Sequence, residues 1–299
     1  MSQRRILIFG YGGVGGALGM RLKAEGWSIA ATARNREAGA ALAAEGVDSL
    51  DPADPGAMVQ AVQGADAILV TAPPTDAGCP GLAAIAAPLA ARRDAAPWIG
   101  YLSTTGVYGD HAGRWVFEET AVAPLSTEAV RRVQAEAAWT GLAAGIGAPL
   151  AIFRLPGLYG PGRSALDRVR AGEVRRIVRS GHVFSRLHLD DAASGVAAAI
   201  GHRRPRATYN LCDDEPAPNA DVIAHAARLL GVPVPPEEAL DLATLSPPAR
   251  RFWSENKRVS NALAKAQLGW RPAYPTYREG LAAVLAAESE PAGPLARER

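Results

Sequence analysis

Three groups of residues have the types and spacing needed for chemistry on a bound small molecule. The first is a glycine-rich turn between an apolar run and a helical stretch, made of Gly10, Tyr11, Gly12, Gly13, Val14 and Gly15. The second is a set of hydroxyl residues that end a later apolar run, namely Ser103, Thr104 and Tyr108. The third is a pair of arginines, Arg34 and Arg36, about 20 residues beyond the glycine turn, where dinucleotide sites select their cofactor.

The glycine turn predicts a dinucleotide-binding site that involves all six of its residues. Gly10, Gly12 and Gly15 fit the spacing G-x-G-x-x-G. In that pattern the first glycine allows a tight turn, the second lets the backbone approach a pyrophosphate, and the third lets the helix pack on the strand. The phosphates then meet the free N–H groups of the helix N-terminus. The alternative is a purely structural turn, but the strand before it and the helix after it favour nucleotide binding.

The residues that end the second apolar run bear on the choice between NAD and NADP. A carboxylate there would bind the ribose hydroxyls, whereas an arginine would accommodate a 2′-phosphate. Arg34 follows the run directly, Arg36 lies two residues further on, and the first acid is Glu37. We therefore predict NADP(H) over NAD(H), with Arg34 as the better candidate. The alternative is that both arginines are solvated residues at the start of a helix.

Short apolar runs that alternate with helical stretches must position these residues. The runs typical of strands are 6–9, 28–33, 67–71, 98–103 and 150–155, and the first helical stretches are 15–25 and 36–45. Such alternation predicts an α/β fold with a Rossmann-type, doubly wound parallel sheet. Ligands bind at the carboxyl ends of such strands, so we expect Ser103 and the segment Thr71, Ala72 and Pro73 to border the cofactor.

The second half of the chain has a different rhythm. Turn-rich segments follow Pro156, and the later helical stretches are 191–201, 219–230, 261–268 and 277–287. We predict a dinucleotide-binding part over 1–160, to which later segments return as part of the sheet. A smaller C-terminal substrate-binding cap is expected over 161–290, with a flexible tail over 291–299.

Composition excludes several classes of function. The formal net charge is only +2, so no bulk field favours nucleic acid or a membrane surface. Two cysteines make no disulfide framework, no apolar run reaches the length of a membrane span, and no His, Cys and carboxylate spacing indicates a metal site. We expect a cytoplasmic protein with a small-molecule substrate. The basic residues include only three lysines, and none lies between Lys23 and Lys257, which excludes a catalytic lysine from the middle of the chain.

Four motifs in order along the chain resemble those of the extended short-chain dehydrogenase/reductase superfamily, which includes NAD(P)-dependent epimerases and dehydratases. They are the glycine turn and the segments 103–109, 154–163 and 186–191, and a late segment over 260–272 adds to the likeness. The resemblance implies an oxidoreductase or epimerase acting on a hydroxyl- or carbonyl-bearing substrate, with sugars among the candidates. It also implies that Pro156 and Gly157 shape the nicotinamide pocket, that Thr104 polarises a carbonyl, and that the helix over 128–139 forms a homodimer.

The chain departs from the family at its catalytic Tyr-x-x-x-Lys pair. Glu128 stands at the position of the tyrosine and Arg132 at that of the lysine. Arginine can hold a ribose hydroxyl but does not release a proton near neutral pH. Glu128 could exchange one if burial raised its pKa, Tyr108 could replace the missing acid, and water is the third candidate for the proton donor. The alternatives are a solvent-facing ion pair between Glu128 and Arg132 and a Thr104 that only caps backbone.

The remaining polar motifs allow two interpretations each. The family binds a nucleotide-sugar diphosphate near a run of arginines, here Arg168, Arg170, Arg175, Arg176 and Arg179, although a solvated basic face explains the run as well. His188 is interpreted as structural, with Asp190 or Asp191 as a helix N-cap. These departures indicate an atypical member of the superfamily. It is either an enzyme with non-standard catalytic residues or an NADP(H)-binding sensor or regulatory protein without turnover.

Overall fold

A seven-stranded parallel sheet forms the centre of the computed structural model, which describes residues 3–289. The strand order is β11-β7-β5-β4-β1-β2-β3. The strands are β1 (Arg5–Phe9), β2 (Ser28–Thr32), β3 (Asp48–Leu50), β4 (Ala67–Val70), β5 (Trp98–Thr104), β7 (Leu150–Leu155) and β11 (Arg206–Asn210). Because the order runs outward from β1 in both directions, the prediction of a doubly wound Rossmann-type sheet is confirmed.

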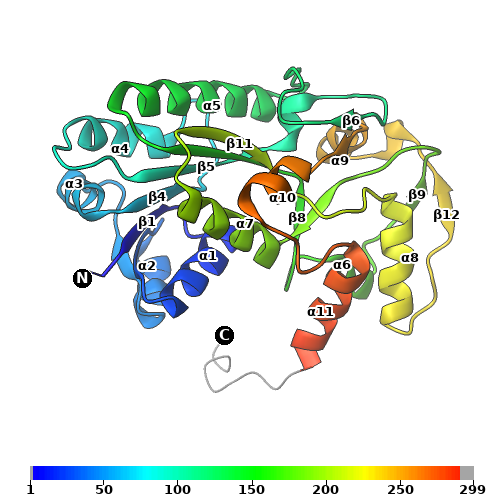
Figure 1. Cartoon of the computed structure of the whole chain (residues 1–299). Helices are drawn as coiled ribbons and strands as arrows, with labels where there is room; N and C mark the ends of the chain where they lie inside the picture. The colour runs from blue at the N-terminus through cyan, green and yellow to red at the C-terminus, as the bar shows by residue number, and fades with distance from the viewer. Residues whose placement is uncertain (1–2, 290–299) are drawn as a thin grey trace.

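Helices cover both faces of this sheet (Figure 1). One face carries α1 (Gly13–Ala24), α2 (Arg36–Ala44), α7 (Leu189–His202) and α10 (Ala262–Leu268). The other carries α3 (Pro55–Gly64), α4 (Pro80–Ala90) and α5 (Thr127–Ile146). None of the helices within residues 3–289 is long and apolar enough to cross a membrane.

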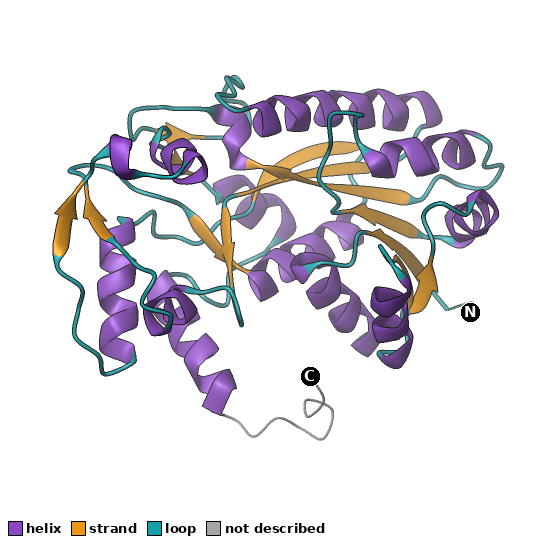
Figure 2. Cartoon of the chain, turned by 180° about the vertical axis from the view of Figure 1, so that it is seen from behind, coloured by secondary structure: helices purple, strands orange, loops and turns teal. Residues whose placement is uncertain are grey.

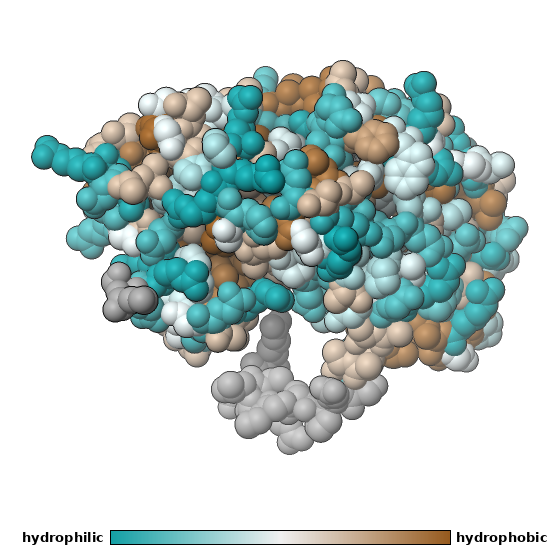
Figure 3. All heavy atoms as spheres, in the orientation of Figure 1, coloured by the Kyte–Doolittle hydropathy of each residue, from teal (hydrophilic) through white to brown (hydrophobic). Residues whose placement is uncertain are grey.

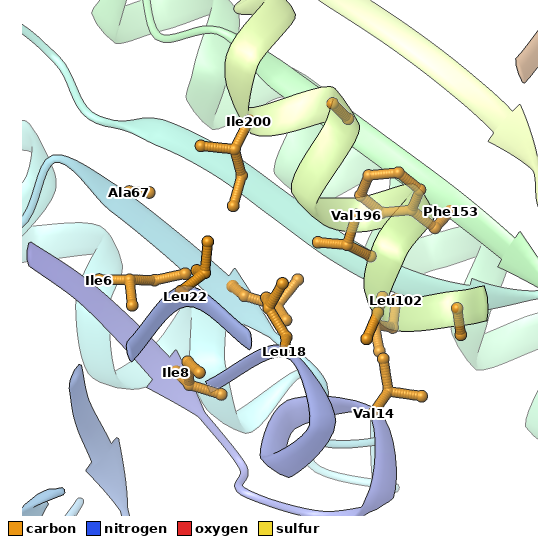
Figure 4. Packing of buried hydrophobic residues seen from close by; sticks show 14 of the residues in the cluster. Ile6, Ile8, Val14, Leu18, Leu22, Ala67, Leu102, Phe153, Val196 and Ile200 are labelled. Atoms are coloured by element: carbon orange, nitrogen blue, oxygen red, sulfur yellow. The ribbon is translucent and has the colours of Figure 1, made fainter. Parts of the chain in front are cut away.

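The two hydrophobic clusters on either side of the sheet follow from the two-residue period of its strands. Ile6 and Ile8 of β1 belong to one cluster, and Leu7 and Phe9 to the other. Figure 4 shows Ile6 and Ile8 in the first cluster, with Leu18 of α1 packed nearby. Burying each such side chain stabilises the fold by about 1.5–3 kcal/mol. These contacts hold α1, and with it the glycine turn, against the end of β1.

The cap consists of segments that follow β7. It contains α6 (Ala165–Arg170), α8 (Asn219–Leu229), η2 (Leu242–Thr244), α9 (Pro247–Trp253) and α11 (Tyr277–Ser289). Two short parallel ladders join β8 (Gly157–Tyr159) to β10 (Arg186–His188) and β9 (Arg176–Val178) to β12 (Glu237–Ala239). Figures 1 and 2 place α8, β9 and β12 at the end of the molecule away from the N-terminus.

A third ladder links the cap segment to the loops at the carboxyl edge of the sheet. It pairs β6 (Trp115–Val116) with β13 (Arg258–Val259). β11 likewise comes from the second half of the chain and pairs with β7. The elements β3, α3 and α4 lie in segments for which the sequence pattern specified no element. The tail predicted over 291–299 lies outside the described residues. On the face shown in Figure 3, hydrophobic and hydrophilic residues are interspersed.

Candidate functional site

The glycine turn between β1 and α1 leaves open space above the N-terminus of α1. Gly10 has φ +94°, and a Cβ there would lie 2.7 Å from Thr71 Oγ1. A Cβ on Gly15 would lie 2.7 Å from the Gly10 carbonyl oxygen, whereas a Cβ on Gly12 would meet no atom within 4 Å. Gly12 is also the N-cap of α1 and has no side-chain cap hydrogen bond. Gly10 and Gly15 therefore make the tight turn possible, and Gly12 leaves room for a ligand beside the helix N–H groups.

Two threonines hold this turn in place. The Gly10 N–H donates to Thr32 Oγ1 at 2.9 Å, and the Thr71 hydroxyl donates to the Gly10 carbonyl. The backbone N–H groups of Thr71 and Ala72 both point to the Phe9 carbonyl, at 3.0 and 3.3 Å. Thr71 and Ala72 therefore lie directly beside the turn, and Pro73 follows them as an exposed residue. Sequence reasoning missed Thr32, although its place at the carboxyl end of β2 is a signal for this role.

The side chains within the turn have different surroundings. Tyr11 packs back along α1, where a Cβ on Gly19 would lie 2.7 Å from Tyr11 Cε2. Burial raises the pKa of the Tyr11 hydroxyl. Gly13 faces Leu189 of α7, since a Cβ on Gly13 would lie 3.1 Å from Leu189 Cδ2, and Val14 is buried in the core. Only backbone is thus presented on the open side of the turn at Gly12.

Arg34 and Arg36 are both exposed just beyond β2. Asn35 between them caps α2, accepting from the Ala38 N–H at 2.9 Å. Within residues 3–289, neither guanidinium has an ion pair or a hydrogen bond to the protein. Two uncommitted cations therefore stand at the carboxyl end of the strand next to the glycine turn.

A buried polar network lies behind the carboxyl ends of β5 and β7. Ser103 Oγ donates to Glu136 Oε1 at 2.5 Å. Arg154 binds the same carboxylate through two nitrogens, with Nε–Oε1 3.2 Å and Nη2–Oε2 2.7 Å. The Arg154 Nη1 also donates to the Tyr108 hydroxyl at 3.0 Å, and that hydroxyl donates to Asn210 Oδ1 at 2.8 Å. Ser103 and Tyr108 thus use their hydroxyls inside the protein.

The surroundings of Tyr108 differ from those that a replacement acid requires. Tyr108 has no exposed surface, and burial raises the pKa of its hydroxyl. Both hydrogen-bonding directions of the hydroxyl are taken, by Arg154 and by Asn210. Within the described structure, Tyr108 therefore supports the strand ends and does not face a ligand.

The two substituted positions on α5 bind different partners. Arg132 donates to the Leu102 carbonyl and to the Tyr101 hydroxyl, so it connects α5 to the end of β5. The side chain of Glu128 is 62% exposed and faces Arg251 at 3.7 Å. A bond to its own backbone N–H and the Arg251 charge lower the pKa of Glu128. Glu128 therefore lacks the burial on which a role in proton exchange depends, and its ionic partner is Arg251 in place of the expected Arg132.

Thr104 ends β5 and lines a hollow of about 360 Å³ at the carboxyl edge of the sheet. Its Oγ1 accepts from the Gly106 N–H at 3.1 Å and so caps η1 (Thr105–Tyr108). The hydroxyl keeps its proton free to donate into the hollow, because a hydroxyl both donates and accepts. Pro156 and Gly157, which follow β7, also line this hollow. Its far wall comes from the cap and includes Phe184, Arg251, Phe252, Glu255 and Lys257.

A second hollow of about 350 Å³ shares the Gly157, Phe184, Ser185 and Phe252 walls with the first. Of the predicted basic run, Arg168 lines it. The other four arginines are engaged elsewhere, Arg170 with Glu288, Arg175 with Glu238, Arg176 with Glu237 and Arg179 with the Trp253 carbonyl. The run is therefore mostly structural, because its side chains fasten cap elements to one another.

His188 is itself the N-cap of α7, which corrects the assignment of that role to Asp190 or Asp191. Its Nδ1 accepts from the Asp190 N–H at 3.2 Å, and burial lowers the pKa of the ring. Asp191 instead accepts from the backbone N–H groups of Ala273 and Tyr274, at 2.6 and 3.1 Å. His188 therefore caps α7, and Asp191 fixes the helix to the segment 273–274. Among residues 3–289, no three His, Cys, Asp or Glu side chains gather where they could hold a metal ion.

Comparisons with known proteins place this geometry in a family. No protein-family model matches the sequence. Protein YeeZ of Escherichia coli K12 is 30% identical over 244 residues, which cover 78% of this chain and 86% of that protein. A conserved protein of unknown function from Silicibacter pomeroyi DSS is 43% identical, with TM-score 0.86 over 95% of this chain and 99% of that one.

Two proteins named as enzymes are similar to the chain, one over part of its sequence and one in fold. A 3-diazoavenalumate denitrifying reductase from Streptomyces is 34% identical over 142 residues, which are 44% of this chain and 45% of that protein, so the match spans less than half of each. A dTDP-glucose 4,6-dehydratase from Streptomyces venezuelae, solved with NAD and TYD bound, shares the fold at TM-score 0.76 and 17% identity, over 94% of this chain and 96% of that one. The fold, the glycine turn and these similarities agree, and the chain belongs to the extended short-chain dehydrogenase/reductase superfamily.

Proposed function

We propose that the chain is an NADP(H)-dependent oxidoreductase that acts on a small carbonyl- or hydroxyl-bearing molecule. One observation carries this proposal: the open turn at Gly12 and the hollow beside Thr104 lie at the same carboxyl edge of one parallel sheet. Ligands of such sheets bind along that edge, where the strand order reverses. A nucleotide that extends from Gly12 toward Thr104 would bring its reactive end to the hollow.

The residues of the turn fit the phosphates of a dinucleotide. Gly12 offers space, and the first N–H groups of α1 offer donors and the positive end of the helix dipole. Arg34 and Arg36 supply positive charge directly after β2, and within residues 3–289 neither is paired with an acid. Arginine binds phosphate through two N–H groups at once, which supports NADP(H) as the cofactor.

The chemistry would take place where Thr104 faces the hollow. A bound nicotinamide would supply a hydride there, and the Thr104 hydroxyl would donate a hydrogen bond that polarises the substrate carbonyl. Pro156 and Gly157 form the wall of the hollow at the end of β7. The name of the partial Streptomyces relative supports a reductive direction.

Binding and turnover can be measured on the purified chain. We expect NADPH to bind with a rise in its fluorescence and to be oxidised in the presence of one member of a panel of small aldehydes and ketones. Thr104→Ala should lower kcat about 100-fold or more, as expected for removal of a polarising donor. The matched control Thr244→Ala, in the exposed η2 turn, should leave kcat unchanged.

The same measurement decides the second candidate function, an NADP(H) sensor without turnover. The exposed Glu128 and the backbone-bound Arg132 favour that candidate, since neither offers a proton to a ligand. Tight NADPH binding with no oxidation across the panel would support the sensor and refute the oxidoreductase. Failure of the chain to bind either dinucleotide would refute both.

The cofactor preference has a separate test in Arg34→Ala. Loss of a charge-assisted hydrogen bond costs about 1.5–3 kcal/mol, so NADPH affinity should fall roughly 10- to 150-fold while NADH affinity stays within about twofold. Arg21→Ala, another exposed arginine on the same side of the sheet, is the control. An equal loss for NADPH and NADH would contradict the assignment of Arg34 to the 2′-phosphate.

A further inference from the structure

Lys257 lines the same hollow as Thr104, although it comes from the far end of the chain. It directly precedes β13, and the ladder of β13 with β6 holds it against the loops that follow β5. Its side chain is only 8% exposed. A lysine on a surface usually extends its ammonium group into water. The burial of Lys257 beside the hollow therefore shows that the surrounding structure fixes its position.

The hydrogen bonds of Lys257 leave one donor uncommitted. Its Nζ donates to the Gly109 carbonyl at 2.8 Å and to the Glu255 carboxylate. An ammonium group carries three N–H donors and no acceptor. Within residues 3–289, two donors have protein partners, and the third is available to a group in the hollow. An unpaired buried donor is costly, so this site favours a ligand that presents an oxygen.

Lys257 differs chemically from the cation on α5. Arg132 is bound to the Leu102 carbonyl, and a guanidinium keeps its proton at all working pH values. A lysine can give up a proton and take it back. Glu255 lies beside Lys257 and lines the hollow as well, with a side chain that is 17% exposed. The ion pair thus connects the buried Lys257 ammonium group to the Glu255 carboxylate, which is partly exposed to solvent.

On the basis of the proposed function, we propose that Lys257 binds the reacting oxygen of the substrate and supplies its proton. As a hydride from the nicotinamide of the proposed function adds to the carbonyl carbon, a C–H bond forms and negative charge develops on the carbonyl oxygen. One N–H bond of Lys257 breaks and one O–H bond forms, which leaves a neutral amine and an alcohol. The Glu255 carboxylate then takes up a proton from solvent water and passes it to the amine, so that the ammonium–carboxylate pair is restored. Thr104, at the end of β5, polarises the same oxygen from the wall of the hollow that the sheet provides.

The test uses three variants and a probe that needs no cofactor. Lys257→Met removes the charge and the donors, Lys257→Arg keeps both but cannot release a proton, and Lys23→Met removes an exposed lysine of α1 as the matched control. The probe is 4-nitrophenol, whose phenolate absorbance reports an oxyanion bound to a hydrogen-bond donor. We expect the unmodified chain to bind the phenolate form. Lys257→Met should weaken that binding about tenfold, as for one charge-assisted hydrogen bond.

Turnover of the panel substrate then separates binding from proton transfer. In Lys257→Met, kcat should fall about 100-fold or more, the usual contribution of a general acid. Lys257→Arg should restore phenolate binding to within about threefold of the unmodified chain while kcat stays low, because a guanidinium donates hydrogen bonds without releasing a proton. Lys23→Met should match the unmodified chain in both assays. Thermal unfolding of each variant identifies any loss that comes from misfolding, and Lys257→Arg decides if Lys257→Met does not fold.

Two results would overturn the proposal. One is an unmodified chain that does not bind the phenolate, and the other is a folded Lys257→Met that binds it and turns over normally. NADPH fluorescence in the same samples keeps the two proposals distinct. If the unmodified chain does not bind NADPH, the proposed function is refuted. If it binds NADPH but Lys257→Met changes neither phenolate binding nor kcat, only the proposal for Lys257 is refuted.

Discussion

Replacing Glu136 by glutamine should destabilise the fold far more than the same change at an exposed ion pair. Glu136 and Arg154 are 7% and 8% exposed, and two hydrogen bonds join the guanidinium to the carboxylate. Ser103 donates to the same carboxylate. Glutamine keeps the shape of the side chain and one acceptor oxygen, but it removes the negative charge. Arg154 would then remain buried without an opposing charge.

The size of the effect follows from burial. Removing one member of a buried pair costs about 3–5 kcal/mol, because the remaining charge is not compensated. Arg154 keeps its bonds to the Tyr108 hydroxyl and the Glu118 carbonyl, so we expect a value near the lower limit, about 3 kcal/mol. For a chain of this size, that loss lowers Tm by roughly 5–10 °C. An exposed ion pair contributes only about 0–1 kcal/mol.

Urea unfolding followed by tryptophan fluorescence measures this difference. Glu25→Gln is the control, since Glu25 pairs with Arg21 at 3.8 Å and both side chains are about half exposed. It should change stability by less than about 0.5 kcal/mol. Adding Arg154→Met to Glu136→Gln should recover part of the loss, because it removes the unpaired charge. A loss of stability below about 1 kcal/mol in Glu136→Gln would refute the reasoning. So would additive effects, in which Arg154→Met destabilises the Glu136→Gln variant as much as it destabilises the unmodified chain.

Two further predictions concern the turn and a buried histidine. Gly12→Ala and Gly15→Ala add the same methyl group, but only the second meets the Gly10 carbonyl. We expect Gly12→Ala to keep Tm but to weaken NADPH binding about tenfold or more, because the added methyl group blocks the approach of the pyrophosphate to the backbone. Gly15→Ala should lower Tm. Equal losses of Tm in the two variants would contradict this prediction. Burial lowers the pKa of His182 to about 4, so the folded chain resists protonation while the unfolded chain accepts it. Stability should fall by about 3 kcal/mol as pH drops from about 6.5 to 4, and His182→Phe should remove that dependence in urea titrations at several pH values.

The alternating apolar runs were sufficient to predict the sheet, because β1, β2, β4, β5 and β7 are buried on both faces and read as continuous apolar segments. β3 has only three residues and is partly exposed, so it carries no such signal. For α3, the cap Asp54 followed by Pro55 at the first helical position was a usable start signal. α4 is apolar nearly all round and contains Pro88, which hides its helical period.

Sequence alone could not decide which hydroxyl at the end of β5 faces a ligand. Ser103 and Thr104 are adjacent, and successive side chains of a strand point to opposite sides. The structure turns Ser103 into the buried network with Glu136 and leaves Thr104 on the hollow. The motif therefore locates the end of the strand, but only the structure shows which of the two hydroxyls faces the hollow. The same limit applies to Tyr108, because the sequence does not reveal the two buried hydrogen bonds that engage its hydroxyl.

The long stretch without lysine illustrates how far composition can constrain a mechanism. The absence of lysine between Lys23 and Lys257 excludes that residue from α5, where the family carries its cation. It does not exclude lysine from the hollow, because the β6–β13 ladder brings residue 257 beside the loop that ends at Gly109. Distance along the chain says little about distance in a sheet with crossover connections. A search for the missing proton donor should therefore follow the strand pairings into the hollow, and within residues 3–289 those pairings lead to Lys257 with Glu255 beside it.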